Sequence, residues 1–306
     1  MRVLVTGGAG FIGSHVAEAC LAAGYDVVAL DDLSSGKREN LPSAIRLEAC
    51  DVRSPRAVAL VKDFKPDVLV HHAAQMSVTR SVAEPAFDAD VNVLGLINLV
   101  EAGRKVGLKR VVFASSGGTV YGETTRYPIP EDAPTHPVCP YGVSKLSGEH
   151  YLFYYNRVFA LSSAALRYAN VYGPRQDPHG EAGVIAIFSK KLLAAQDVTI
   201  FGDGGQTRDY VFVKDVVRAN LAAIAGDFCG SVNIGTGKET NVNELYDVIK
   251  RHAGGPGKAV HAAARDGELR RSVLDVSMAA RVLDWKPSIS LADGLAETVD
   301  FFRSRS

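Results

Sequence analysis

The chain opens with the stretch Arg2-Val3-Leu4-Val5-Thr6-Gly7-Gly8-Ala9-Gly10-Phe11-Ile12-Gly13, in which a short apolar run meets a cluster of glycines. The apolar run at 2–5 is predicted to form a buried strand, and a helix is predicted over 12–23. Gly7, Gly10 and Gly13 lie between them at G-x-x-G-x-x-G spacing. Glycine allows a tight turn, close approach of a pyrophosphate and packing of the helix on the sheet, and the helix start offers free N–H groups to phosphate. This stretch therefore predicts a strand–loop–helix unit that binds a dinucleotide.

Short apolar runs alternate with helical patterns through the first half of the chain. Further strands are predicted over 26–30, 45–49, 68–71 and 110–114, and helices over 55–64 and 87–106. Strands this apolar, joined by helices, form parallel sheets that are covered on both faces. The pattern predicts an α/β fold, a doubly wound parallel sheet of the Rossmann type, with ligands outside the carboxyl ends of its strands.

The second half of the chain is less regular. Segments 170–183 and 201–209 are rich in Gly, Pro and charged residues and are expected to be long loops, and helices are predicted over 215–225, 242–252 and 293–303. We expect an NAD-binding Rossmann domain over 1–169, to which the chain returns at about 206–228. A smaller, irregular α/β substrate domain is expected from 170–205 and 229–306.

Composition argues against several classes of protein. The 306 residues are 47% hydrophobic, too apolar for a disordered chain, and 34 Lys and Arg balance 34 Asp and Glu. A chain with no net charge lacks the drive for nucleic-acid binding that counterion release gives, so no such partner is expected. No apolar run approaches the roughly 20 residues of a bilayer span, and the N-terminal run is too short for a signal peptide. We expect a cytoplasmic protein with no membrane partner.

No metal site is predicted. The four cysteines lie far apart and include no C-x-x-C pair. His71 and His72 are adjacent strand residues, which point to opposite faces of a sheet, and no further ligand spacing accompanies them.

Acidic residues follow the second and third predicted strands. Asp31 lies 21 residues after Gly10, where an acidic side chain hydrogen-bonds the adenosine ribose, and Asp32 follows it. Carboxylates there repel a 2′-phosphate, which predicts NAD rather than NADP. Asp51, just before Val52, is a candidate contact for adenine; the alternative is a cap for the helix over 54–64.

Tyr141 and Lys145 lie four residues apart in a helix predicted from Pro140 to about Phe159, so they share one face. Spacing alone leaves open that they are an exposed tyrosine and a solvated lysine. A tyrosine with an ordinary pKa near 10 needs about 4 kcal/mol to act as a base near neutral pH. A cation about 5 Å away contributes on the order of 3 kcal/mol at an effective dielectric of 20. Lys145 together with a positively charged nicotinamide could therefore make Tyr141 a base.

With both motifs present, the chain resembles the extended short-chain dehydrogenase/reductase family, of the NAD-dependent epimerase/dehydratase type, over essentially all of its length. Within that family it looks most like the UDP-glucose 4-epimerases. The strings that carry the resemblance are T-G-G-A-G-F-I-G-S-H from Thr6, D-D-L-S-S-G from Asp31, H-A-A from His72, N-V-L-G from Asn92, S-S-G-G-T-V-Y-G from Ser115, P-Y-G-V-S-K from Pro140, R-Y-A-N-V-Y-G-P-R from Arg167 and R-D-Y-V-F-V from Arg208.

The resemblance implies an NAD-dependent isomerase that acts on a UDP-sugar. Tyr141, assisted by Lys145, removes the proton of the sugar 4-hydroxyl while hydride passes from C4 to NAD; the 4-keto sugar turns in the pocket, and hydride returns to its opposite face. Alternatives are another nucleotide-sugar enzyme, such as a UDP-glucuronate 4-epimerase or a 4-ketoreductase, and a noncatalytic NAD-binding regulator. By family analogy the protein is a homodimer that pairs the helices over 87–106 and 141–159.

The resemblance also implies the residues of the site. The diphosphate is expected to contact Asn170 and Arg208, Arg265 and Glu268 to lie near uridine and phosphate, and Val184 and Phe201 to line the uracil site; for each arginine the alternative is a surface ion pair. The residues expected at the cofactor are Gly7, Gly10, Phe11, Ile12, Gly13, Asp31, Asp32, Ser35, Gly36, Asp51, Val52, Ala73, Ala74, Gln75, Asn92, Ser115, Tyr141, Lys145 and Tyr168.

The chain departs from the family pattern at the sugar. The serine or threonine that binds the sugar hydroxyl is replaced by Gly117, so we expect Ser116 or Thr119, or a bridging water, to take its place. Related dehydratases carry carboxylates just after that position, where this chain has Gly118 and Thr119, so elimination is not expected. Ser272 aligns, seven residues after Arg265, with a position that a tyrosine closes to bulky C2 substituents. Serine leaves room for an N-acetyl group, which predicts activity on UDP-GlcNAc and UDP-GalNAc as well.

Overall fold

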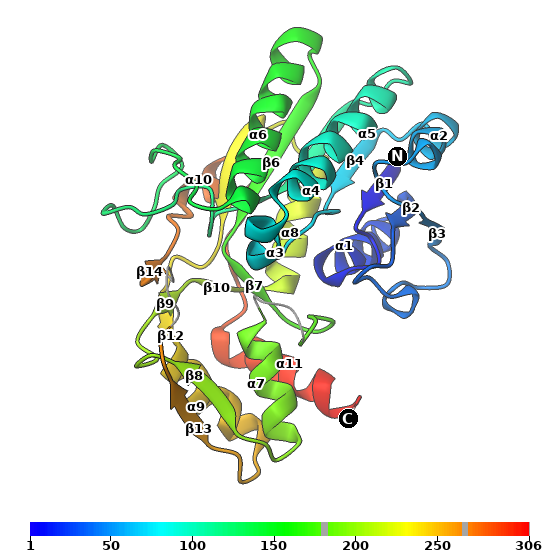
Figure 1. The fold of residues 1–306 in the computed structure, drawn as a ribbon. Helices are drawn as coiled ribbons and strands as arrows, with labels where there is room; N and C mark the ends of the chain where they lie inside the picture. Colours follow the sequence, from blue (N-terminus) through cyan, green and yellow to red (C-terminus); the bar gives the residue numbers. More distant parts are fainter. Residues whose placement is uncertain (179–182, 265–268, 306) are drawn as a thin grey trace.

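The computed structural model describes residues 1–178, 183–264 and 269–305. Within them, a seven-stranded parallel sheet forms the upper part of the molecule in Figure 1. Its strand order is β3-β2-β1-β4-β5-β6-β11. The strands are β1 (Arg2–Thr6), β2 (Asp26–Asp31), β3 (Arg46–Ala49), β4 (Val68–His71), β5 (Arg110–Ser116), β6 (Ser162–Tyr168) and β11 (Gly230–Ile234).

Helices cover both faces of this sheet because the strands are apolar on both sides. Val3 and Val5 of β1 belong to the core under α1 (Phe11–Ala22), α8 (Val213–Ala225) and α10 (Ser277–Val282). Leu4, which points the other way, packs under α2 (Pro55–Phe64), α5 (Gly95–Arg104) and α6 (Pro140–Phe159). The predicted doubly wound fold is confirmed.

A second, smaller part lies beyond the carboxyl ends of the strands, at the bottom of Figure 1. Three small sheets form it: β7 (Asn170–Tyr172) with β10 (Tyr210–Phe212), β8 (Val198–Phe201) with β13 (Ala259–Ala262), and β9 (Thr207–Arg208) between β12 (Thr240–Asn241) and β14 (Arg271–Ser272). Three helices pack together around a core that includes Phe188, Leu245 and Leu295. They are α7 (Val184–Leu193), α9 (Val242–Ala253) and α11 (Leu291–Arg303).

Several sequence predictions need correction. The helix expected over 87–106 is three pieces, α4 (Pro85–Ala89), the one-turn π-helix η2 (Asp90–Leu94) and α5. The segments 170–183 and 201–209, expected to be loops, contain the short strands β7 and β9. The sequence division places β11 in the substrate domain, but it is an edge strand of the large sheet. Four helices were not predicted: η1 (Arg38–Asn40), α3 (Val78–Ala83), α7 and α10. None of the helices in the described ranges is both long and apolar enough to cross a membrane.

Candidate active site

The glycine loop joins β1 to α1 at the switch point of the sheet, where β1 lies between β2 and β4. Gly7 has φ +62°, and a Cβ there would lie 2.7 Å from the backbone nitrogen of Ala73 at the end of β4. A Cβ on Gly13 would lie 2.1 Å from the Gly7 carbonyl oxygen, so only glycine lets α1 start this close to the loop. A Cβ on Gly10 would meet only the Gly7 oxygen, at 3.2 Å, within the described part of the chain. Gly10 thus leaves open space at the first turn of α1, beside Phe11 and Ile12.

Asp31 at the end of β2 is buried and supports this loop. Its carboxylate accepts hydrogen bonds from the backbone N–H of Ala9 (3.0 Å) and of Leu33 (2.8 Å). A Cβ on Gly36 would lie 2.6 Å from the same carboxylate, which explains the glycine at that position. Asp32 and Ser35 are exposed, and Asp32 accepts hydrogen bonds from the backbone and hydroxyl of Ser34.

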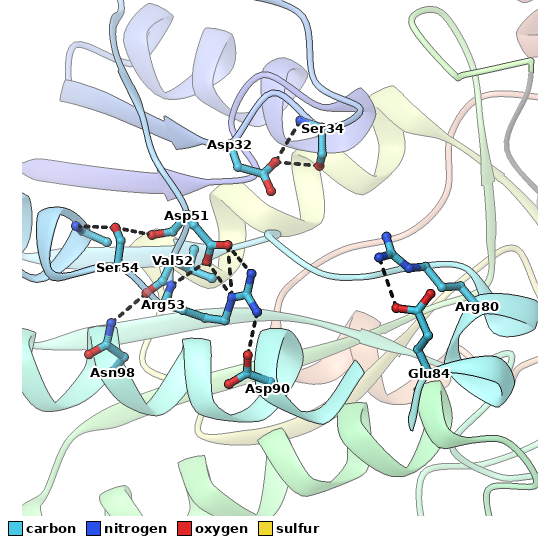
Figure 2. Close-up of polar contacts among 11 residues, drawn as sticks. Asp32, Ser34, Asp51, Val52, Arg53, Ser54, Arg80, Glu84, Asp90 and Asn98 are labelled. Carbon is cyan, nitrogen blue, oxygen red and sulfur yellow. Dashed lines mark hydrogen bonds and ion pairs between the residues drawn. The ribbon is translucent and has the colours of Figure 1, made fainter. Parts of the chain in front are cut away.

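Asp51 is held by Arg53 rather than serving as a helix cap. Figure 2 shows the Arg53 guanidinium between Asp51 and Asp90, 2.5 Å and 2.6 Å away. Hydrogen bonds from Arg53 lower the pKa of the Asp51 carboxyl. The side chain that caps α2 belongs to Ser54, which accepts from Ala57 N–H, so the capping alternative for Asp51 is wrong. Val52 is buried, and its carbonyl accepts from Asn98.

The loop after β4 carries Ala73, Ala74 and Gln75 past the glycine loop and is fixed by Asn92. The Ala73 N–H donates to Thr6 Oγ1 at 3.2 Å. Asn92, in the π-helix turn, accepts from Gln75 N–H at 2.8 Å and donates to Ser144 Oγ at 3.1 Å. Asn92 therefore connects this loop to the part of α6 between Tyr141 and Lys145, although its side chain is itself buried.

Tyr141, which is partly buried, and Lys145, which is buried, lie one turn apart on α6. Lys145 is 3% exposed, and its Nζ lies 5.7 Å from the centre of the Tyr141 ring and 5.1 Å from that of Phe113. Burial lowers the pKa of Lys145 to about 8, whereas burial and the Asp88 charge raise the pKa of Tyr141. The alternative of a solvated lysine is wrong, since Lys145 is buried.

Ser116 and Thr119, the residues expected to replace the hydroxyl missing at Gly117, lie near the start of α6: Ser116 contacts Tyr141, and Thr119 lies next to Gly142. The Ser116 side chain hydrogen-bonds Tyr141 and lowers its pKa. Thr119 Oγ1 is buried and has no hydrogen-bond partner among the described residues. A Cβ on Gly117 would lie 2.5 Å from Leu274 Cδ1, so a serine there requires Leu274 to move. The Leu274 side chain thus occupies the space that the family's hydroxyl residue would need.

Two residues expected at the cofactor have their side chains engaged within the protein. Ser115 is buried, and its hydroxyl donates to Glu149 on the face of β5 opposite Ser116. The Tyr168 hydroxyl donates to Asn220 Oδ1 at 3.1 Å and lies 3.2 Å from His72 Nε2. Any contact of Ser115 with a cofactor would have to use its backbone.

The residues expected at the substrate lie in the smaller part of the molecule. Arg208 and Ser272 are direct partners across β9 and β14, and Ser272 is 7% exposed. Asn170 and Val184 line one small cavity together with Tyr210. Phe201 ends β8 and is partly buried. Arg265 and Glu268 lie outside the described residues.

The histidines carry no sign of a metal. In the described ranges no three His, Cys, Asp or Glu side chains are grouped closely enough to hold an ion. His71 Nδ1 lies 2.9 Å from Thr6 Oγ1, and burial lowers the pKa of both His71 and His72 to about 3, so both rings are neutral.

Sequence reasoning missed three buried carboxylates around the site. Asp88 accepts hydrogen bonds from Gln75 and Asn92 on one oxygen, while its other oxygen has no partner in the described part of the chain. Asp209 accepts from the N–H groups of Thr236 and Gly237 and so fixes the segment next to Arg208. Glu149 continues the Tyr141–Lys145 face of α6. Glu149 could have been found from the sequence, because it lies eight residues after Tyr141 and so on the same face of a helix.

Comparison with known proteins identifies the family. Residues 3–235 match the model of the NAD dependent epimerase/dehydratase family. The chain is 50% identical over 313 residues to a UDP-glucose 4-epimerase of Mycolicibacterium smegmatis, with 100% of both chains covered. The structure of the Thermotoga maritima UDP-glucose 4-epimerase with UDP-glucose superposes with TM-score 0.97 at 46% identity, covering 100% of this chain and 99% of that one. That of the Thermus thermophilus UDP-glucose 4-epimerase with NAD superposes with TM-score 0.94 at 44% identity, covering 100% of both. The chain belongs to the NAD-dependent epimerase/dehydratase family.

Proposed function

We propose that this chain interconverts UDP-glucose and UDP-galactose by reversible oxidation at C4 of the hexose, with NAD as its cofactor. The observation that carries the proposal is the Tyr141–Lys145 pair on α6, in which Lys145 is buried beside the Tyr141 ring. Asn92 connects this part of α6 to the loop that lines the glycine turn. The sequence predicts this activity, this enzyme class and this cofactor, and the family and the named relatives bear out all three.

The residues at the switch point fit a dinucleotide. Gly10 leaves open a space that a Cβ would partly fill. This space lies next to the backbone N–H groups at the start of α1, which can bind phosphate. Asp31 uses its carboxylate to fix the loop, and its negative charge would repel a 2′-phosphate. Asp32 adds a second negative charge nearby, consistent with NAD. NAD held there would supply the hydride acceptor and donor for C4 of the sugar.

Side chains of the protein transfer the proton of the sugar 4-hydroxyl. The Lys145 ammonium stabilises the phenolate form of Tyr141, which takes the proton of the sugar 4-hydroxyl and becomes a neutral phenol. The Ser116 side chain hydrogen-bonds Tyr141, and the Thr119 hydroxyl, which is buried and has no partner among the described residues, is our candidate for a contact with the sugar. Gly118 offers no carboxylate for elimination, so the 4-keto sugar is reduced again rather than dehydrated.

The substrate range is proposed to include UDP-GlcNAc and UDP-GalNAc. Ser272 is small, and it is the strand partner of Arg208, which we expect at the diphosphate. A tyrosine in its place would fill the space that an N-acetyl group needs.

We propose that the protein is a homodimer. α6 presents an apolar surface whose Phe153 is 65% exposed, Val158 58% and Val143 50%, and Leu94 of the neighbouring π-turn is 56% exposed. Figure 1 shows α5 and α6 side by side at one edge of the molecule, where a second copy could cover them. Sedimentation should give twice the chain mass, and Phe153→Glu should give the monomer.

The predicted cytoplasmic location stays a prediction.

Incubation with UDP-glucose, UDP-GlcNAc and UDP-glucuronate, each assayed for its C4 epimer and for NADH, tests the proposal. We expect UDP-galactose and UDP-GalNAc with no net NADH. Conversion of UDP-glucuronate alone would make the chain a uronate epimerase. Stoichiometric consumption of NADH would make it a ketoreductase, and turnover of none of the three would favour a regulator.

A further inference from the structure

One more turn along α6, Glu149 continues the face that carries Tyr141 and Lys145, at spacing i, i+4 and i+8. Its carboxylate is 7% exposed and accepts four side-chain donor groups. The Ser115 hydroxyl donates to one oxygen and the Ser231 hydroxyl to the other, and Arg167 donates through Nε at 3.0 Å and through Nη2 at 2.6 Å. Every one of these donors belongs to β5, β6 or β11 of the central sheet.

Arg167 extends these contacts to the loop that follows β5. It is 6% exposed, and its Nη1 donates to the Tyr121 hydroxyl at 2.8 Å and to the Glu131 carbonyl at 3.3 Å. Tyr121, 1% exposed, in turn donates to Asn233 Oδ1 at 2.7 Å. The hydrogen bonds and the Glu149 charge raise the pKa of Arg167, so it stays cationic. Arg167 therefore contacts both the catalytic helix and the segment that contains Thr119.

The network connects the three chain segments that carry the chemistry. Glu149 fixes α6, which holds Tyr141; Ser115 fixes the end of β5, one residue from Ser116; and Tyr121 fixes the loop two residues from Thr119. Stability alone does not explain a buried ion pair, because apolar side chains of similar size often stabilise such a site equally well. The ion pair makes directional hydrogen bonds to all three segments at once, which an apolar core cannot do.

We propose that Glu149 and Arg167 are positioning residues, which set the distance of Tyr141 on α6 from the hydroxyls of Ser116 and Thr119. They act through the side chains that they hold. The proposal rests on the proposed function, because it assigns these residues to the same reaction.

The decisive variant replaces both charges by apolar side chains of similar size, Glu149→Leu with Arg167→Met. Glu149→Gln alone leaves a buried, unpaired guanidinium and should lower both Tm and kcat. The double variant should regain most of the lost Tm, yet its kcat should stay lower than wild type by a factor on the order of 10 to 100, with KM and NAD content near wild type. Tyr121→Phe, which removes one hydroxyl from the core, tests the same connection if the double variant fails to fold. It should lower kcat with little change in KM, and the loss of this hydroxyl as a partner of Asn233 and Arg167 should lower Tm somewhat.

Arg110→Met is the matched control. Arg110 is also a buried arginine of the sheet, on the same strand as Ser115 but at its opposite end, where it donates to the Ala223 and Phe228 carbonyls. Its loss should lower Tm and leave kcat unchanged. Wild-type kcat in the double variant or in Tyr121→Phe would overturn the positioning role. Absence of epimerisation by the wild type would instead overturn the proposed function, so the two failures are distinguishable.

Discussion

Replacing Lys145 by methionine should move the acid limb of the pH–rate profile to higher pH. The Lys145 charge lies 5.7 Å from the Tyr141 ring, where Coulomb attraction at an effective dielectric of about 20 favours the phenolate by about 3 kcal/mol. That energy corresponds to about 2 pKa units of Tyr141. Activity that needs the phenolate is present above this pKa and lost below it. Removing the cation raises the pKa of Tyr141, so the midpoint should rise by about 2 pH units and kcat near neutrality should fall about 100-fold.

The assay is kcat for conversion of UDP-galactose across the acid limb, with the bound NAD of each variant measured after denaturation. Because burial lowers the pKa of Lys145 to about 8, its charge is present below that pH and can act there. Lys145→Arg, which keeps a cation, is the matched control and should shift the midpoint much less. An unchanged midpoint in Lys145→Met with full NAD content would refute the assignment of Lys145 to the Tyr141 base.

Three further variants probe the surroundings of this pair. Ser116→Ala with Thr119→Ala should lower kcat by a factor on the order of 100, as for loss of a positioned proton-handling group, and unchanged turnover would remove both hydroxyls from the mechanism. Asp88→Asn keeps an acceptor for Gln75 and Asn92 but removes a charge that raises the pKa of Tyr141, so the midpoint of the acid limb should move to lower pH, opposite to Lys145→Met; a shift upward contradicts this. Ser272→Tyr should lower turnover of UDP-GlcNAc relative to UDP-glucose, and an equal ratio in wild type and variant means that Ser272 is not the gate.

Five of the seven strands of the central sheet, β1 to β5, could be predicted from the sequence because their signals are local, whereas β6 and β11 were not predicted. β4 (Val68–His71) and α2 (Pro55–Phe64) have the predicted bounds, since a continuous apolar run and a Ser-Pro start define them without distant contacts. The π-helix turn at Asn92 was not predicted, because one extra residue in a turn barely alters the apolar periodicity. What holds it is the tertiary contact of Asn92 with Gln75. The two-residue strands β9, β12 and β14 give no periodic signal at all, and pairing between distant segments creates them.

The candidate site was predictable where one motif contains the chemistry. The spacing of Tyr141 and Lys145 and the glycines of the first loop identify the expected catalytic and cofactor regions from the sequence alone. The burial of Lys145, the occupation of the Gly117 space by Leu274 and the engagement of Ser115 by Glu149 depend on segments up to 157 residues apart in the sequence. Such contacts follow from packing of the whole chain, which no local pattern encodes.

The most direct test of the account follows the hydrogen at C4. UDP-glucose labelled with deuterium at C4 is incubated with the enzyme, and the UDP-galactose that forms is examined by mass spectrometry and NMR while NADH is monitored by absorbance. If Tyr141 handles only the hydroxyl proton and hydride returns to the same carbon, the product should keep the deuterium at C4, with no net NADH. Loss of the deuterium to solvent, or NADH in proportion to product, would contradict the account.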